Sequence, residues 1–110
     1  MKDDEATTAA ETEARLRYAN EYIEKTSTYP ESPETMQVLC ECGAADCATL
    51  MTVTPGEYEE VRTDPTHFVV VGGHVLPDIE RVVRETDRFV VVAKREGAPA
   101  EVAREEDPRT

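Results

Sequence analysis

The stretch CECGAADC, residues 40–47, contains all three cysteines of this 110-residue chain. On an extended backbone, residues two positions apart point to the same side, so the sulfurs of Cys40 and Cys42 can face one point. We expect Gly43 to adopt a positive φ, after which the chain can loop Cys47 back toward the same point. The spacing therefore predicts that three thiolates converge on one metal ion.

A structural zinc ion takes four tetrahedral ligands, and three cysteines with one histidine are one of its common ligand sets. The chain has two histidines. We expect His74 to be the fourth ligand, because the preceding Gly72–Gly73 lets an imidazole approach a site with little steric cost. His67, at the start of the same predicted strand, is the alternative. Glu41 and Asp46 are second-choice ligands, since hard carboxylates compete poorly beside soft thiolates.

The predicted core is small enough to need a stabilising ion. Without its polar ends and first helix the chain leaves roughly 60 residues, a size at which an apolar core alone is marginal. Structural zinc contributes on the order of 10–16 kcal/mol in small zinc-binding peptides, which is comparable to the net stability of a domain. We therefore expect one structural zinc ion, the loss of which partly unfolds the chain.

Other interpretations of the cysteines remain open. Clustered thiolates are oxidisable, so a thiol redox site or a zinc–thiolate redox switch is an alternative, as are an iron–sulfur cluster and free cysteines. A structural disulfide is not expected, because a bond between Cys40 and Cys42 closes a strained ring and leaves an odd thiol. The cytoplasm, where we expect this protein, is also reducing.

The residues around the cysteines predict an α+β fold with a small antiparallel sheet. A hairpin encloses the cysteines, a later apolar run is expected to be the central strand, and a second hairpin follows, with a short helix as the alternative to its first strand. An edge strand at 89–93 could pair between chains, although Lys94 and Arg95 are typical of edge protection. The predicted strands are 36–40, 48–53, 68–71, a short one at Val82–Val83, and 89–93.

Two helices complete the prediction. Residues at spacings of three and four place an apolar face on an N-terminal amphipathic helix over 10–25. Thr54, Pro55 and Glu57 form a capping-box pattern that predicts a second helix over 55–63, which ends before Asp64–Pro65. The apolar positions of the first helix are Leu16, Ala19, Tyr22 and Ile23.

Charge and length limit the class of protein. The chain has 24 acidic and 12 basic residues, a formal net charge of −12 and a pI near 4.5, so nucleic acid is not an expected partner. No apolar run reaches the roughly 18–20 residues that a membrane span needs, and no signal peptide is recognised. We expect a single domain in the cytoplasm, with a solubilising acidic surface. The predicted layout is a disordered N-terminus (1–9), a zinc-binding domain (10–96, with a linker at 26–35 and a core at 36–96) and a disordered acidic tail (97–110).

The motif also resembles that of a family of small uncharacterised actinobacterial proteins. The similarity runs from about Asn20 to Pro108 and includes Cys-Glu-Cys-Gly at 40–43, a third cysteine and a Gly-His pair at 73–74. Leu39, Ala44–Ala45 and Gly72 depart from the residues that are frequent in the family. The resemblance implies a Cys₃His metal site at Cys40, Cys42, Cys47 and His74, and it implies no activity.

No catalytic motif accompanies the cysteines. Four ligands fill a tetrahedral zinc ion, which leaves no position for the water of a catalytic site, and no metalloprotease, deaminase or phosphate-binding pattern is present. We therefore expect a non-catalytic protein-interaction module with no catalytic residues and with a partner and an oligomeric state that the sequence does not name. Its N-terminal helix docks either on its own domain or on a partner, to which Tyr18, Tyr22 and Tyr29 could contribute.

Overall fold

The cysteine segment lies in a hairpin, as the sequence predicts. The computed structural model describes residues 3–27, 35–44 and 47–109. Within them, β1 (Met36–Leu39) pairs antiparallel with β2 (Leu50–Val53), and Leu39 lies opposite Leu50. The hairpin brings the two ends of the cysteine segment together.

The helix after the hairpin is capped as its sequence predicts. In α2 (Pro55–Val61) the Thr54 hydroxyl accepts from the Glu57 N–H at 3.0 Å, and the Glu57 carboxylate accepts from the Thr54 N–H at 2.8 Å. This reciprocal pair satisfies two backbone donors that the first turn of a helix leaves free. Tyr58 and Val61 anchor the helix in the core.

The second sheet contains β3 (His67–Val70), β4 (Glu80–Glu85) and β5 (Val90–Lys94) in the antiparallel order β3-β5-β4. The second predicted hairpin is therefore confirmed. The expectation that 68–71 is the central strand is wrong, because β5 pairs with strands on both sides. The expectation of an edge strand at 89–93 fails for the same reason, and Lys94 is not edge protection: it lies buried between Glu13 and Glu80.

The two sheets are joined at the cysteine segment. The Glu41 N–H donates to the Val69 carbonyl at 2.8 Å, so the chain that leaves β1 runs along the outer edge of β3. One hydrophobic core continues through both sheets and α2. Its largest members include Tyr58, Phe68 and Phe89.

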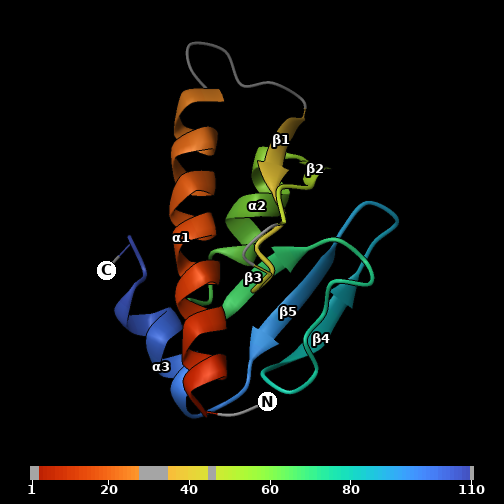
Figure 1. Cartoon of the computed structure of the whole chain (residues 1–110). Helices are drawn as coiled ribbons and strands as arrows, with labels where there is room; N and C mark the ends of the chain where they lie inside the picture. The colour runs from red at the N-terminus through yellow and green to blue at the C-terminus, as the bar shows by residue number, and fades with distance from the viewer. Residues whose placement is uncertain (1–2, 28–34, 45–46, 110) are drawn as a thin grey trace.

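The N-terminal helix begins earlier than predicted and docks on its own domain. Helix α1 (Asp3–Ser27) lies against β1 and α3 along one side of the molecule (Figure 1). The prediction that 1–9 is disordered is therefore wrong from Asp3 onward. Ala6 and Ala9 in this stretch pack with Ile79. Alanines contribute little to the apolar pattern of a sequence, which is why this part of the helix was not predicted. Their small side chains nevertheless allow a helix to pack closely.

The buried face of α1 also differs from the predicted apolar face. Tyr22 is 66% exposed, whereas the polar side chains of Glu13, Arg17 and Asn20 are fully buried. They are buried because each finds partners inside: the Arg17 guanidinium, for example, donates to the carbonyls of Pro65 and Ala103 at 2.5 and 2.7 Å. An apolar periodicity cannot reveal a helix face that is held by polar contacts.

The C-terminal tail is ordered rather than disordered over 98–105. Helix α3 (Ala98–Glu105) packs on α1 (Figure 1), and its Ala100 and Ala103 are buried. After it, Arg109 forms ion pairs with three glutamates on α1 and α2. The tail looked too polar to order, but Arg109 is paired with carboxylates of the helices beneath it.

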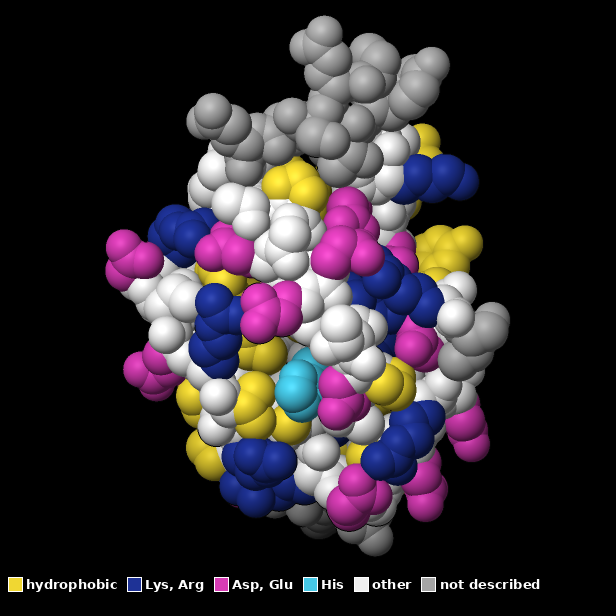
Figure 2. All heavy atoms as spheres, turned by 180° about the vertical axis from the view of Figure 1, so that it is seen from behind, with side chains coloured by type: hydrophobic (Ala, Val, Ile, Leu, Met, Phe, Trp, Pro, Cys, Tyr) yellow, Lys and Arg dark blue, Asp and Glu magenta, His cyan; other side chains and the backbone are white. Residues whose placement is uncertain are grey.

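The charges of the surface are mixed. Figure 2 shows acidic and basic side chains interspersed over one face of the molecule. Among the described residues, no helix has an apolar stretch of the length that a bilayer requires. The predicted linker at 26–35 falls mainly on residues 28–34, outside the described part of the chain.

Candidate metal centre

The two sides of the segment after β1 have different roles. The Cys40 N–H donates to the Thr49 carbonyl at 2.8 Å and extends the hairpin by one hydrogen bond. Because the backbone is extended here, Cys40 and Cys42 project to one side and Glu41 projects to the other. The predicted convergence of the first two thiols is therefore a consequence of strand geometry.

The histidine comes from a tight turn at the end of β3. The His74 N–H donates to the Val71 carbonyl at 3.0 Å, and Gly73, the third residue of this turn, has a φ of 88°. A positive φ at this position is typical of a type II turn and favours glycine. The turn directs His74 back over the cysteine segment, as the sequence predicts.

The four predicted ligand atoms come together. The sulfurs of the three cysteines and a ring nitrogen of His74 all lie within 4.8 Å of one another. His74 Nδ1 lies 3.5 Å from the Cys40 sulfur and 3.6 Å from the Cys47 sulfur. In tetrahedral geometry, Zn–S and Zn–N bonds of about 2.3 and 2.0 Å separate a sulfur from a nitrogen by about 3.5 Å. This group can hold one metal ion.

Backbone N–H groups point at the sulfurs. The Val71 N–H donates to the Cys40 sulfur at 3.2 Å. The Thr49 N–H is the main cause that lowers the pKa of the Cys47 thiol to about 7. Such donors stabilise thiolates and thus favour metal binding. Burial acts in the opposite direction, and it raises the pKa of Cys40 to about 12 and also raises that of Cys42. A cation offsets this cost of burying negative sulfur.

The other predicted candidates lie elsewhere. His67 Nε2 is 3.5 Å from the Asp64 carboxylate, and His67 is not part of the group. Glu41 is not part of it either. Asp46 lies outside the described residues. Of the four side chains in the group, Cys40 and Cys42 are buried, whereas Cys47 and His74 are partly exposed.

Glu41 has a structural role that the sequence did not reveal. Its carboxylate accepts from the Val69 N–H at 3.0 Å, from the Asn20 amide at 2.8 Å and from the Tyr58 hydroxyl at 3.3 Å. Burial raises its pKa, and the hydrogen bonds from Asn20 and Val69 partly oppose that shift. The only sequence signal for this role is its position between Cys40 and Cys42. On an extended chain, the side chain of Glu41 points away from those of its two neighbours.

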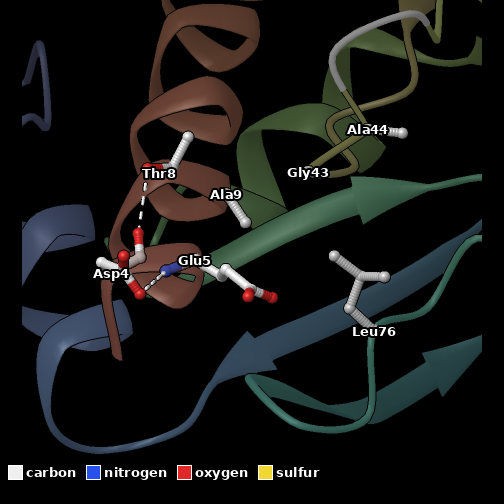
Figure 3. A pocket seen from close by; sticks show the side chains of 7 residues that line it. All are labelled: Asp4, Glu5, Thr8, Ala9, Gly43, Ala44 and Leu76. Atoms are coloured by element: carbon white, nitrogen blue, oxygen red, sulfur yellow. Dashed lines mark hydrogen bonds between the residues drawn. The ribbon is translucent and has the colours of Figure 1, made fainter. Parts of the chain in front are cut away.

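Gly43 is needed for a reason other than the predicted one. Positive φ values among the described glycines occur at Gly73 and Gly97. A Cβ atom on Gly43 would instead lie 2.8 Å from the Ala9 Cβ and 3.0 Å from the Leu76 side chain. These residues surround a hollow between α1 and the metal-binding segment (Figure 3). Gly43 therefore permits close approach to α1.

The fold and the site together define an α+β protein with a Cys₃His group that can hold one metal ion. Comparisons of the chain with protein-family models, with curated proteins and with solved structures find no significant match. They therefore give no support to the resemblance to the actinobacterial family.

Proposed function

We propose that this chain is a non-catalytic zinc-binding protein in which a structural zinc ion stabilises a small protein-interaction domain. The observation that carries the proposal is the convergence of three sulfurs and one imidazole nitrogen within 4.8 Å. Soft thiolates with one imidazole in tetrahedral reach favour zinc over the harder cations, which prefer oxygen ligands. The implied ligands are Cys40, Cys42, Cys47 and His74.

A structural role follows from the number and the origin of the ligands. Four protein ligands fill a tetrahedral coordination sphere, which leaves no position for an activated water molecule. Two elements supply them, the β1–β2 hairpin and the turn after β3. When bound, the ion ties the β1–β2 hairpin to the turn that follows β3. The binding of such an ion is part of the free energy of folding.

The interaction surface that we propose is the exposed side of α1. Tyr18 and Tyr22 lie one turn apart on it, and each is 66% exposed. Tyrosine is enriched at protein interfaces because it combines apolar area with a hydroxyl. Tyr29, also a predicted contributor, lies outside the described residues. A reducing compartment such as the cytoplasm would keep the three thiols available for the metal.

The two histidines provide the test of the metal site. Native mass spectrometry with metal analysis should find one zinc ion per chain in protein purified without chelators. His74→Ala should weaken zinc binding by at least tenfold, because it removes a ligand, whereas His67→Ala should leave the affinity unchanged. Metal-free protein after such a purification, or equal effects of the two variants, would contradict the proposal.

The partial exposure of Cys47 supports a second candidate function, a zinc–thiolate redox switch. Cys47 is the accessible sulfur of a group in which Cys40 and Cys42 are buried. Hydrogen peroxide would oxidise the thiolates of Cys42 and Cys47 to a disulfide, and with two protons it would be reduced to two water molecules. The disulfide cannot supply both ligands, so zinc would be released.

This second function is tested by the release and recovery of zinc. A chromogenic chelator should report one equivalent of zinc per chain after mild peroxide treatment, and a thiol reductant should restore binding. Cys47→Ser should abolish the rapid phase of release. Resistance of the zinc-loaded protein to low-millimolar peroxide would exclude the switch while leaving the structural role intact.

A further inference from the structure

The segment that holds the metal ligands also holds helix α1. Asn20, on α1, is fully buried and bonds to this segment three times. Its side-chain oxygen accepts from the Leu39 N–H at 2.8 Å, and its amide nitrogen donates to the Leu39 carbonyl and to the Glu41 carboxylate, each at 2.8 Å. These bonds have the correct geometry only while the backbone at 39–41 stays in place.

A second contact lies eleven residues earlier on the same helix. Ala9 packs against Gly43 so closely that a Cβ atom on the glycine would lie 2.8 Å from the Ala9 Cβ (Figure 3). Eleven residues of helix span about 16 Å, so the chain at 39–43 contacts α1 at two separated points. These residues are the end of β1 and the start of the cysteine segment.

Contacts with α1 and metal ligands alternate along this segment. Leu39 contacts the helix through its backbone N–H and carbonyl, Glu41 through its carboxylate and Gly43 through the side where a Cβ would stand, whereas the side chains of Cys40 and Cys42 face the metal site. The opposite directions of the Glu41 side chain and of the two cysteine side chains follow the period of two of an extended chain. A metal ion that fixes the two sulfurs therefore also fixes the three neighbouring residues against α1.

Apart from the half-buried Ile23, which packs on the core, the other inward contacts of α1 are made by alanines and by polar side chains, such as Glu13 with Lys94 and Arg17 with the carbonyls of Pro65 and Ala103. The buried side chains on it are alanines together with Glu13, Arg17 and Asn20. Polar side chains stabilise a buried position only when their partners are correctly placed. The sheet of β3, β4 and β5 has instead an apolar interior in which Phe68, Val69 and Val92 are at most 1% exposed.

We propose that metal occupancy controls the docking of α1, so that loss of the ion releases this helix while β3 and β5 remain folded. The inference rests on the proposed metal site and adds a regulatory property to it. When zinc leaves, the segment 39–43 loses its constraint, Asn20 loses its three hydrogen bonds, and Ala9 loses its contact with Gly43. The zinc-loaded site thus holds in place the helix that presents Tyr18 and Tyr22, and we call this coupling the latch.

Hydrogen exchange on the full chain tests the latch. The zinc-loaded protein and the chelator-stripped protein, both with reductant, are compared by mass spectrometry. Amides over 13–20 should exchange at least tenfold faster after stripping, and those over 90–93, in the central strand β5, should change less than threefold. Unchanged exchange in α1 overturns the proposal. Equal acceleration in β5 also overturns it, since the metal would then hold the whole fold.

A variant separates this result from the presence of zinc. Asn20→Ala should accelerate exchange over 13–20 at least tenfold in the zinc-loaded protein, with one zinc ion still bound by native mass spectrometry. Tyr18→Ala, on the exposed side of α1, is the matched control and should leave exchange unchanged. Normal protection of α1 in Asn20→Ala would overturn the latch. Absence of zinc from the unmodified protein would instead contradict the metal site itself.

Discussion

At the scale of single residues, the cysteine segment combines three requirements in few positions. Cys40 and Cys42 must face the candidate metal site, the Glu41 carboxylate must find hydrogen-bond donors in the core, and Gly43 must leave room for α1. An extended backbone meets all of them because neighbouring side chains point in opposite directions. A substitution here should therefore affect either the metal site or the packing against the core and α1, according to the side to which its side chain points.

Gly43→Ala tests the close approach to α1. The added methyl group clashes with Ala9 and should destabilise the zinc-loaded protein by about 1–3 kcal/mol, the usual cost of overpacking. Gly72→Ala is the control, because no atom lies within 4 Å of the Cβ that it adds, and its effect should stay within about 0.5 kcal/mol. Denaturant unfolding with saturating zinc measures both changes.

A compensating change makes the same test more specific. Ala9→Gly removes the methyl group that Gly43→Ala would contact, although a glycine inside a helix costs about 1 kcal/mol. In the double variant, the loss of stability should be smaller than the sum of the two single losses by at least about 0.5 kcal/mol. Additive losses would show that Gly43 matters for another reason.

At the scale of elements, the start of α2 was predictable because its signals are local. Thr54, Pro55 and Glu57 cap the helix within one turn. One partner of this cap comes from far along the chain, since Arg88, between β4 and β5, donates to the Glu57 carboxylate at 2.9 and 2.5 Å. This hydrogen bonding lowers the pKa of Glu57. The cap therefore also fixes the second hairpin.

Glu57→Ala should destabilise the protein by about 1–2 kcal/mol, because it removes the reciprocal capping bond and the partner of Arg88. Glu57→Gln is the matched control. Glutamine retains an acceptor for the Thr54 N–H and should cost less than half as much. Thermal or denaturant unfolding of both variants measures the difference. Equal losses would mean that the charge of Glu57, rather than the cap, supplies the stabilisation.

At the scale of the whole molecule, buried charges connect α1 to the second sheet. Lys94 on β5 forms ion pairs with Glu13 of α1 and Glu80 of β4, and all three side chains are fully buried. Burial is the main cause that raises the pKa of Glu13 to about 8. One oxygen of Glu13 has no hydrogen-bond partner among the described residues. One lysine neutralises two carboxylates only if one of these holds a proton.

This cluster predicts a pH dependence of stability with a definite sign. The folded protein keeps a proton on Glu13 up to about pH 8, whereas the unfolded chain loses it near the ordinary glutamate pKa of 4.5, so folding takes up a proton between these values. The contribution to stability is full below pH 4.5 and is lost as the pH rises through about 8. The slope approaches about 1.4 kcal/mol per pH unit at most.

The measurement compares the original chain with Glu13→Gln between about pH 6 and 8 at saturating zinc. Protonation of the cysteines releases zinc at low pH and acts in the opposite direction, but it is common to both proteins. Stability should fall more steeply with pH in the original chain, by about 1 kcal/mol per unit. Parallel curves would show that Glu13 is ionised in the folded state.

The sequence by itself determined the features that depend on short-range geometry. The hairpin, the capped α2 and the shared direction of Cys40 and Cys42 follow from alternation, capping and turn chemistry within a few residues, and these signals do not depend on where distant elements pack. The candidate group with His74 was predictable because cysteine and histidine are few in this chain. Its convergence also needs the pairing of the cysteine segment with β3, which brings His74 to the sulfurs.

Only the tertiary structure decided how α1 and α3 dock and which strand is central. The buried face of α1 consists of alanines and of polar side chains with partners far away in the chain, such as Glu13 with Lys94 and Asn20 with Leu39. No periodicity marks such a face, because burial there depends on pairing rather than on hydrophobicity. The close approach of Gly43 to Ala9 likewise depends on how α1 docks, so the sequence alone could not predict it.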